Sequence, residues 1–128
     1  MIIFLLSFFA CDDHYFAQKH SPIDTAVGDG FAQVDAIISA SCSGCHGGNF
    51  PPLDGDICED VVGVASVQSS DMLLIEAGSA ENSYLYHKLT NTHLEHGGSG
   101  GVMPMGGALS EAEIEILADW MDEGAACE

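Results

Sequence analysis

Cys42-Ser43-Gly44-Cys45-His46 forms a Cys-x-x-Cys-His run, and the rest of the chain is arranged around it. In a helical turn, residues three and four positions apart share one face, so both thiols and the His46 imidazole lie on the same side. Two thiols at this spacing can bond to the two vinyl groups of one porphyrin, and the adjacent imidazole can bind its iron. The run therefore predicts a haem c attached covalently through Cys42 and Cys45, with His46 as one axial ligand of the iron.

Three other uses of these cysteines fit the sequence less well. A zinc site needs a second pair of ligands, but Cys58 and Cys127 are isolated and no pair of histidines follows at zinc-finger spacing. A thioredoxin-type dithiol needs a βαβ pattern around it, and the sequence has none. A structural disulfide between the two cysteines of the run leaves His46 without a role.

The chain is strongly acidic. It has 128 residues, with 20 Asp and Glu against two basic residues, Lys19 and Lys88, and a formal net charge of −18. A chain of this length forms at most one domain with a modest core. Because phosphate contacts need Lys and Arg, we expect no nucleic-acid partner. The charge suits either a heavily solvated surface or electrostatic steering of a basic redox partner.

Residues 1–10 form an apolar leader. A helix that spans a bilayer needs about 20 apolar residues, so this shorter run predicts the apolar part of a secretory signal. Ala10-Cys11 resembles the end of a bacterial lipoprotein signal, in which the cysteine receives the lipid, although no Lys or Arg precedes the run. We expect a signal peptide over residues 1–11 and a periplasmic or otherwise extracytoplasmic protein, with a membrane tether through lipidated Cys11 left open.

The folded domain is expected over residues 31–128. Residues 12–30 are polar, contain Pro22 and show no periodic pattern, which predicts a flexible tether. The first helix is predicted over residues 31–41, with Asp29 as its candidate N-cap. Its apolar stripe consists of Phe31, Val34, Ile37 and Ile38.

The last helix has the clearest signals at both ends. Ser110 and Glu113 form a capping box, and Gly124 stands where a helix would end. This helix must bury its apolar face, for which the stripe of the first helix is the natural partner. A further helix is predicted from Ser79 to Leu89. These elements predict an all-α fold with long loops. The apolar face of the last helix contains Ile114, Leu117, Trp120 and Met121.

Cys58 and Cys127 predict a disulfide. With Cys42 and Cys45 assigned to haem and Cys11 at the end of the leader, these two cysteines remain as a pair in an oxidising compartment. Two buried free thiols are the alternative, because the sequence does not show whether the pair comes within bonding distance.

The second axial ligand decides the chemistry of the iron. Met103 is the leading candidate, because it lies between a glycine-rich loop and the last helix, and the proline after it restricts the backbone. A thioether ligand opposite a histidine raises the reduction potential of haem iron. Met105 is an alternative with the same chemistry, and His87, His93 or His96 would give a bis-histidine iron. His87 is expected on the surface of its helix.

Residues 31–126 resemble a class I mono-haem c-type cytochrome, with a helix leading into Cys-x-x-Cys-His, a Met-Pro loop and a final helix ending in Trp-x-x-x-Gly-Ala. Residues 82–89 and 102–104 are also similar to cytochrome modules of large secreted bacterial proteins. The resemblance implies crossed N- and C-terminal helices that enclose the haem, with Met103 as the sulfur ligand. It also implies that a proline carbonyl, from Pro51 or Pro52, accepts a hydrogen bond from the proximal histidine.

The expected function is one-electron transfer rather than catalysis, because two axial ligands leave no position on the iron for a substrate. We expect a monomer that meets a membrane or secreted redox protein transiently, over a small interface. A haem-based enzyme or gas sensor is the alternative, in which the sixth position is open or its ligand is displaceable.

Overall fold

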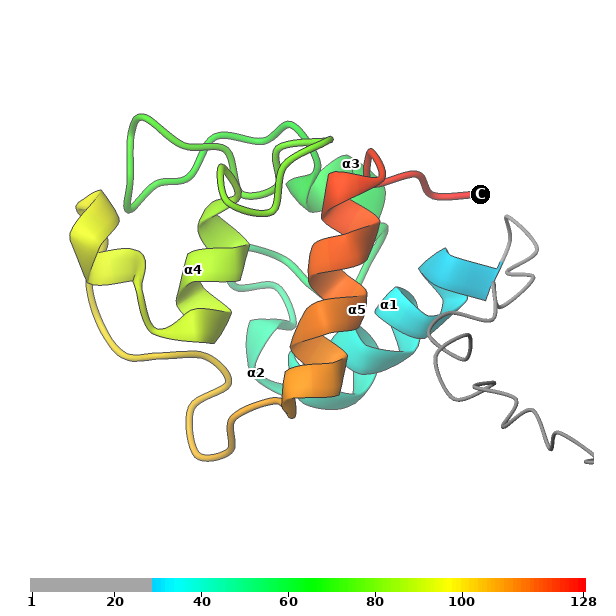
Figure 1. Cartoon of the computed structure of the whole chain (residues 1–128). Helices are drawn as coiled ribbons and strands as arrows, with labels where there is room; N and C mark the ends of the chain where they lie inside the picture. Colours follow the sequence, from blue (N-terminus) through cyan, green and yellow to red (C-terminus); the bar gives the residue numbers. More distant parts are fainter. Residues whose placement is uncertain (1–28) are drawn as a thin grey trace, which may run out of the picture.

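The computed structural model describes residues 29–128, and Figure 1 shows helices joined by long loops. Within these residues there is no β-strand, only isolated bridges between loop segments, so the predicted all-α class is confirmed. The helices are α1 (Asp29–Ser41), α2 (Ser43–His46), α3 (Ile57–Val61), α4 (Tyr84–Thr90), the 3₁₀-helix η1 (His93–His96) and α5 (Glu111–Asp122).

The predictions for the start of the chain fall outside the described residues. They are the signal peptide over residues 1–11, the lipidation of Cys11 and most of the tether over residues 12–30. α1 already begins at Asp29, so the last two residues of the expected tether are helical and Asp29 lies inside the helix. Structural assignments of a helix end commonly differ by one or two residues. No helix of residues 29–128 is long and apolar enough to cross a membrane.

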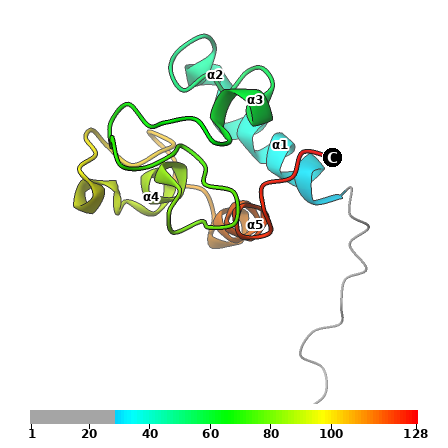
Figure 2. The same ribbon diagram turned by 90° about the horizontal axis from the view of Figure 1, so that it is seen from above.

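α5 packs across α1, as the two apolar stripes predict. Figure 2 looks along the axis of α5 while α1 runs across the view, so the two axes cross steeply. The Phe31 ring of α1 lies 6.0 Å from the Trp120 ring of α5, measured between centroids. A fully buried apolar side chain contributes about 1.5–3 kcal/mol to the stability of the fold. The stripe residues that are at most 2 % exposed are Val34, Ile38, Leu117 and Met121.

Both ends of α5 carry the predicted caps. At the start, the amide of Ser110 donates to the Glu113 carboxylate at 2.8 Å, and the amide of Glu113 donates to Ser110 Oγ at 3.3 Å. At the end, Gly124 has a φ of +109°, a conformation that favours glycine. The chain then turns back, and Trp120 Nε1 donates to the Ala126 carbonyl at 2.7 Å. α5 therefore begins and ends where the sequence predicts.

The predicted disulfide between Cys58 and Cys127 is present, with the two Cα atoms 6.3 Å apart. It joins α3 to the C-terminal segment that follows α5. The two cysteines are 69 residues apart in the sequence, so the bond restricts the unfolded chain strongly. On a loop-closure model, a cross-link of this length is worth about 4 kcal/mol.

α4 begins later than predicted. We expected a helix over residues 79–89, but the helical residues start at Tyr84. Ser79 Oγ accepts a hydrogen bond from the Asn82 amide at 3.2 Å, which closes a single turn. The Tyr84 amide then donates to the Leu73 carbonyl at 2.9 Å and does not continue that turn. A tertiary hydrogen bond of this kind leaves no trace in the side-chain pattern of the helix.

Candidate cofactor site

The two cysteines of the motif lie on one helical turn that follows α1. The amides of Cys45 and His46 donate to the Cys42 carbonyl at 3.1 and 3.0 Å, so the helical geometry assumed for the motif is present. Both thiols are free, with Cys42 partly buried and Cys45 exposed. Burial raises the pKa of the Cys42 thiol, and the neighbouring Cys45 raises it further. Two unpaired thiols therefore stand three residues apart on one short turn.

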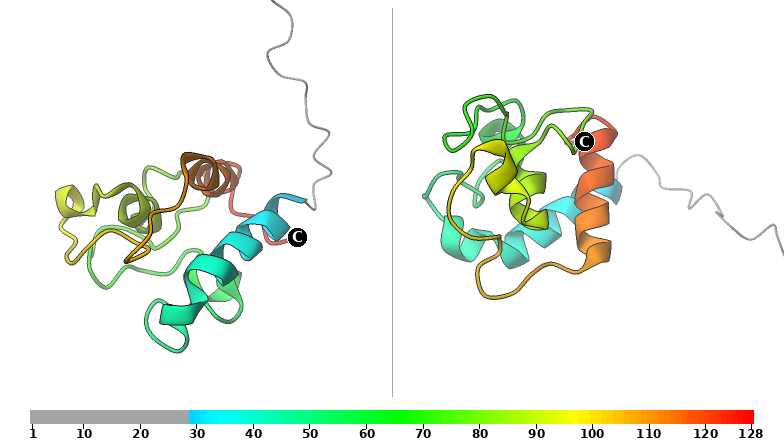
Figure 3. Two further views of the ribbon diagram at one scale, coloured as in Figure 1. Left: turned by 90° about the horizontal axis from the view of Figure 1, so that it is seen from below. Right: turned by 60° about the vertical axis from the view of Figure 1, so that its left-hand side comes forward.

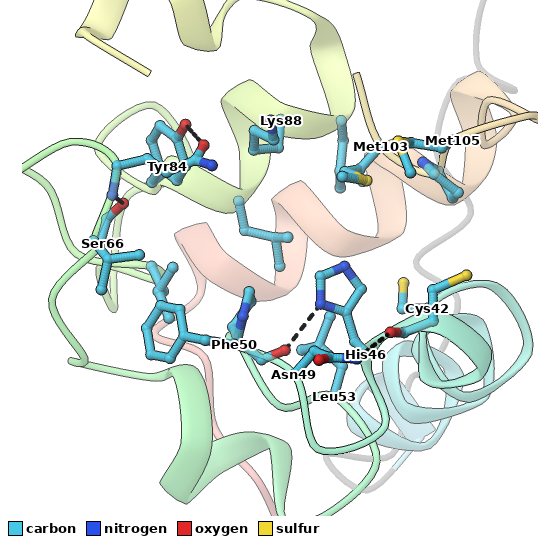
Figure 4. A pocket seen from close by; sticks show the side chains of 18 of the residues that line it. Cys42, His46, Asn49, Phe50, Leu53, Ser66, Tyr84, Lys88, Met103 and Met105 are labelled. Carbon is cyan, nitrogen blue, oxygen red and sulfur yellow. Dashed lines mark hydrogen bonds between the residues drawn. The ribbon is translucent and has the colours of Figure 1, made fainter. Parts of the chain in front are cut away.

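The His46 ring is oriented by the main chain. Its Nδ1 lies 3.0 Å from the carbonyl oxygen of Pro51 (Figure 4). Because a carbonyl only accepts, Nδ1 carries the hydrogen and Nε2 keeps a lone pair that can bind a metal ion. This is the hydrogen bond that the resemblance implied, and Pro51 rather than Pro52 accepts it.

The loop between His46 and Leu53 is tied to the helical turn before it. The Leu53 amide donates to the His46 carbonyl at 3.3 Å, and the Asn49 side chain donates to the Cys45 carbonyl at 3.1 Å. Ser43 Oγ donates to the Leu53 carbonyl. These bonds hold the proline carbonyl beside the imidazole.

A cavity of about 340 Å³ lies next to the imidazole. Ligand pockets commonly measure about 300–1,000 Å³. The motif and its loop form one wall, and α4 with the loop before α5 forms another. The left-hand view of Figure 3 shows the ribbons of the segments that carry these residues. Among the described residues no acidic side chain lines the cavity, although the net charge is −18. Its apolar lining includes Phe50, Leu53, Val67, Leu74, Leu85 and Leu89.

Both methionines of the Met-Pro loop line this cavity, but they differ in exposure. Met103 is partly buried, and its amide donates to the Lys88 carbonyl at 2.9 Å, which ties it to α4. Met105 is 74 % exposed. In Figure 4, Met103 lies across the cavity from His46. The structure thus brings the predicted site residues to one cavity: Cys42, Cys45, His46 and Met103.

The three histidines considered as alternative ligands are not among the residues that line the cavity. His93 is fully buried, and its Nε2 donates to the Gly100 carbonyl at 3.0 Å. His96 is exposed, and the centroid of its ring lies 3.7 Å from that of His87. Of the candidates for the second axial ligand, only the methionines face the motif.

The prediction that His87 lies on the surface is wrong, because the side chain is only 5 % exposed. Its Nε2 donates to the Glu81 carbonyl at 2.7 Å, and its Nδ1 accepts from Thr92 Oγ1 at 2.7 Å. Both ring nitrogens therefore have partners inside the fold, which compensates for their removal from water. His87 stabilises the region between α4 and η1.

The sequence did not lead us to expect Lys88 at the site. This side chain lines the cavity from α4 and is only 8 % exposed. Its Nζ donates to the carbonyls of Ser99 and Gly101, at 2.9 and 2.8 Å. Burial lowers the pKa of its ammonium group. One sequence feature could have indicated its burial: Lys88 is one of only two basic residues, and it lies beside apolar positions of its helix.

The cavity offers two thiols that can form thioether bonds and two donors that can bind iron, an imidazole nitrogen and a thioether sulfur. Within residues 29–128, no three His, Cys, Asp or Glu side chains gather as ligands for a bare metal ion, so the zinc alternative has no ligand cluster there. No protein-family model, curated protein or solved structure matches the chain. Its function is therefore inferred from the chemistry of these residues.

Proposed function

We propose that this chain is a c-type cytochrome that carries single electrons through a covalently bound haem c. The observation that supports this most directly is that Cys42, Cys45, His46 and Met103 line one apolar cavity. Thioether bonds from the two cysteines would hold the haem, and His46 and Met103 would bind its iron. The orientation of His46, with Nδ1 bonded and Nε2 free, suits this role.

We also propose that the all-α fold is a cytochrome c-like arrangement. In class I cytochromes the first and last helices cross beside the haem, and α1 and α5 cross here with their apolar faces buried. α1 also runs directly into the turn that carries the two thiols. Both features agree with a cytochrome c-like arrangement.

The bound haem would supply reversible one-electron chemistry at its iron. The Pro51 carbonyl, 3.0 Å from His46 Nδ1, would fix the imidazole in one orientation and raise its basicity. The Met103 sulfur is a soft donor that favours reduced iron. Apolar side chains around the cavity limit the access of water, which also influences the potential.

The same proposal places the protein outside the cytoplasm, as a monomer that meets a redox protein briefly. The disulfide between Cys58 and Cys127 supports an oxidising compartment, as does the apolar leader over residues 1–10. A lipid on Cys11 would tether the domain to a membrane. With a net charge of −18, the protein would be steered towards a basic partner surface.

A haem-based gas sensor or enzyme is the second candidate. Met103 is only partly buried, and the loop before it contains four glycines between residues 97 and 101. Glycine permits many backbone conformations, so once its hydrogen bonds are broken such a loop could carry the sulfur away from an iron. A small ligand such as CO could then take the sixth position.

The test is absorption spectroscopy of the full chain, produced in a host that attaches haem c. We expect a pigment that stays with the protein in acidified organic solvent, because thioether bonds hold it. The oxidised form should show the band near the red end of the spectrum that marks sulfur–iron ligation, and the reduced form should not bind CO rapidly. Colourless protein or extractable pigment would contradict the proposal, and covalent pigment with rapid CO binding would favour the sensor.

A further inference from the structure

Lys88 carries a buried positive charge in an acidic protein. It is the only Lys or Arg of residues 29–128, and it is 8 % exposed. Burying an ammonium group is costly unless its hydrogens are bonded. Its Nζ donates to the carbonyls of Ser99 and Gly101 at 2.9 and 2.8 Å, and such charge-assisted bonds are stronger than bonds between neutral groups. Two points of one loop are therefore attached to this side chain.

That loop leads directly into Met103. Gly97 and Gly100 both have a φ of +75°, and a glycine-rich backbone loses much conformational entropy when it is ordered. The carbonyl of Lys88 also accepts a hydrogen bond from the Met103 amide at 2.9 Å. One residue of α4 thus holds the loop at three points, the last of which is the methionine itself.

The remaining contacts explain why Met103 rather than Met105 would be held. His93 Nε2 donates to the Gly100 carbonyl at 3.0 Å, between the two points held by Lys88. Met105 lies two residues beyond the last of these bonds and is 74 % exposed. The anchored part of the loop ends at Met103.

We propose that Lys88 is the positioning residue for the sulfur ligand of the iron. Its ammonium group and its carbonyl hold residues 99–103 against α4, so that the Met103 sulfur stays next to the iron. Lys88 acts through the loop and does not itself touch the iron. This inference rests on the proposed haem c function.

The test compares variants of the full chain, each produced with haem attached. Lys88→Met removes the ammonium group but keeps an unbranched apolar side chain and the main-chain carbonyl. Lys88→Arg keeps a charged donor that can bond two carbonyls. Val61→Ala is the matched control, because Val61 is 1 % exposed in α3 and does not line the cavity, so its truncation lowers stability without touching the loop.

We expect Lys88→Met to keep covalent pigment but to lose most of the sulfur–iron band. Its reduced form should bind CO about tenfold faster than the wild type, because the observed rate follows the fraction of molecules with an open iron, and this corresponds to about 1.4 kcal/mol. Lys88→Arg should restore the band. Val61→Ala should keep the band and the slow CO binding while it melts at a lower temperature.

A Lys88→Met protein with the wild-type band and slow CO binding would overturn the role of Lys88 and leave the haem proposal intact. Equal loss of the band in Val61→Ala would also overturn it, because low stability would then explain the effect. A wild type without covalent pigment would overturn both proposals, whereas covalent pigment without the band would overturn the sulfur ligation and with it the role of Lys88. If Lys88→Met does not accumulate, Lys88→Gln is measured in the same way, with partial loss of the band expected and an unchanged band contradicting the inference.

Discussion

The two walls of the cavity are held in different ways. On the His46 side, the hydrogen bonds come from separate donors spread over residues 43–53: a ring nitrogen, a side-chain amide, a hydroxyl and a main-chain amide. On the Met103 side, three of the bonds that hold residues 99–103 involve one residue, Lys88. The first wall is held by four bonds from four different residues, whereas most bonds of the second wall involve the single residue Lys88.

This difference separates a robust region from a sensitive one. A hydrogen bond between neutral groups contributes about 0.5–1.5 kcal/mol, whereas one to a charged group contributes about 1.5–3 kcal/mol. Losing one bond near His46 should therefore leave its loop in place. Losing the Lys88 side chain should release the loop that carries Met103. If the cavity holds a haem as proposed, the His46 side would keep its position when single contacts are lost, and changes to the Lys88 side chain would mainly alter the sulfur ligand.

The largest effect is expected from removing the attachment itself. In the double variant Cys42→Ser/Cys45→Ser, no thioether can form, so nearly all pigment should be extracted by acidified organic solvent. The measurement is the absorbance that remains with the protein after extraction. Retention of the pigment at the wild-type level would contradict the role of these cysteines.

Gly44→Ala is the matched control for the double variant. It changes the same turn, and beyond the adjoining residues and its own helix backbone, a Cβ added at Gly44 meets no atom within 4 Å. We expect it to keep its pigment covalently bound. If it also loses the pigment, the turn is disturbed by any substitution and the thiols are not specifically responsible.

The next largest effect is expected on the Met103 side. Met103→Ala should lose the sulfur–iron band completely and bind CO in the reduced form, because the iron then lacks its sulfur ligand. Met105→Ala should keep the band and the slow CO binding, since Met105 is 74 % exposed and lies beyond the anchored part of the loop. The reverse pattern would show that Met105 is the ligand. The part of the loop held by Lys88 would then not supply the sulfur.

The smallest effect is expected at the end of this loop, where α5 begins. Hydrogen bonds from the amide and hydroxyl of Ser110 lower the pKa of the Glu113 carboxyl. A lowered pKa means that the charged cap stabilises the fold above the unfolded pKa of about 4.3, and that this contribution is lost as the pH falls through the folded pKa.

Glu113→Gln should therefore lower the melting temperature slightly at neutral pH and flatten its fall in acid. Glu115→Gln, at an exposed position of the same helix that takes no part in the cap, is the control. The measurement is the melting temperature of the wild type and of both variants from neutral to acid pH. An unchanged acid profile in Glu113→Gln would show that the capping box does not contribute to the pH dependence.

Much of the fold could be predicted because its signals are local. The capping box at Ser110 and the stop at Gly124 depend on residues within a few positions of each other, and the structure confirms both. The pairing of Cys58 with Cys127 followed from elimination among five cysteines. The start of α4 at Tyr84 was missed, because a carbonyl of another loop binds its amide.

The sequence by itself determined which groups could bind a haem, since the spacing of Cys42, Cys45 and His46 places them on one turn whatever the rest of the chain does. Only the tertiary structure decided that Met103 faces this turn, that His93 bonds elsewhere and that Lys88 is buried behind the loop. The physical reason is the separation in sequence of the interacting residues. A helical turn needs only neighbouring residues, whereas the opposite wall of the cavity depends on how distant segments pack against each other.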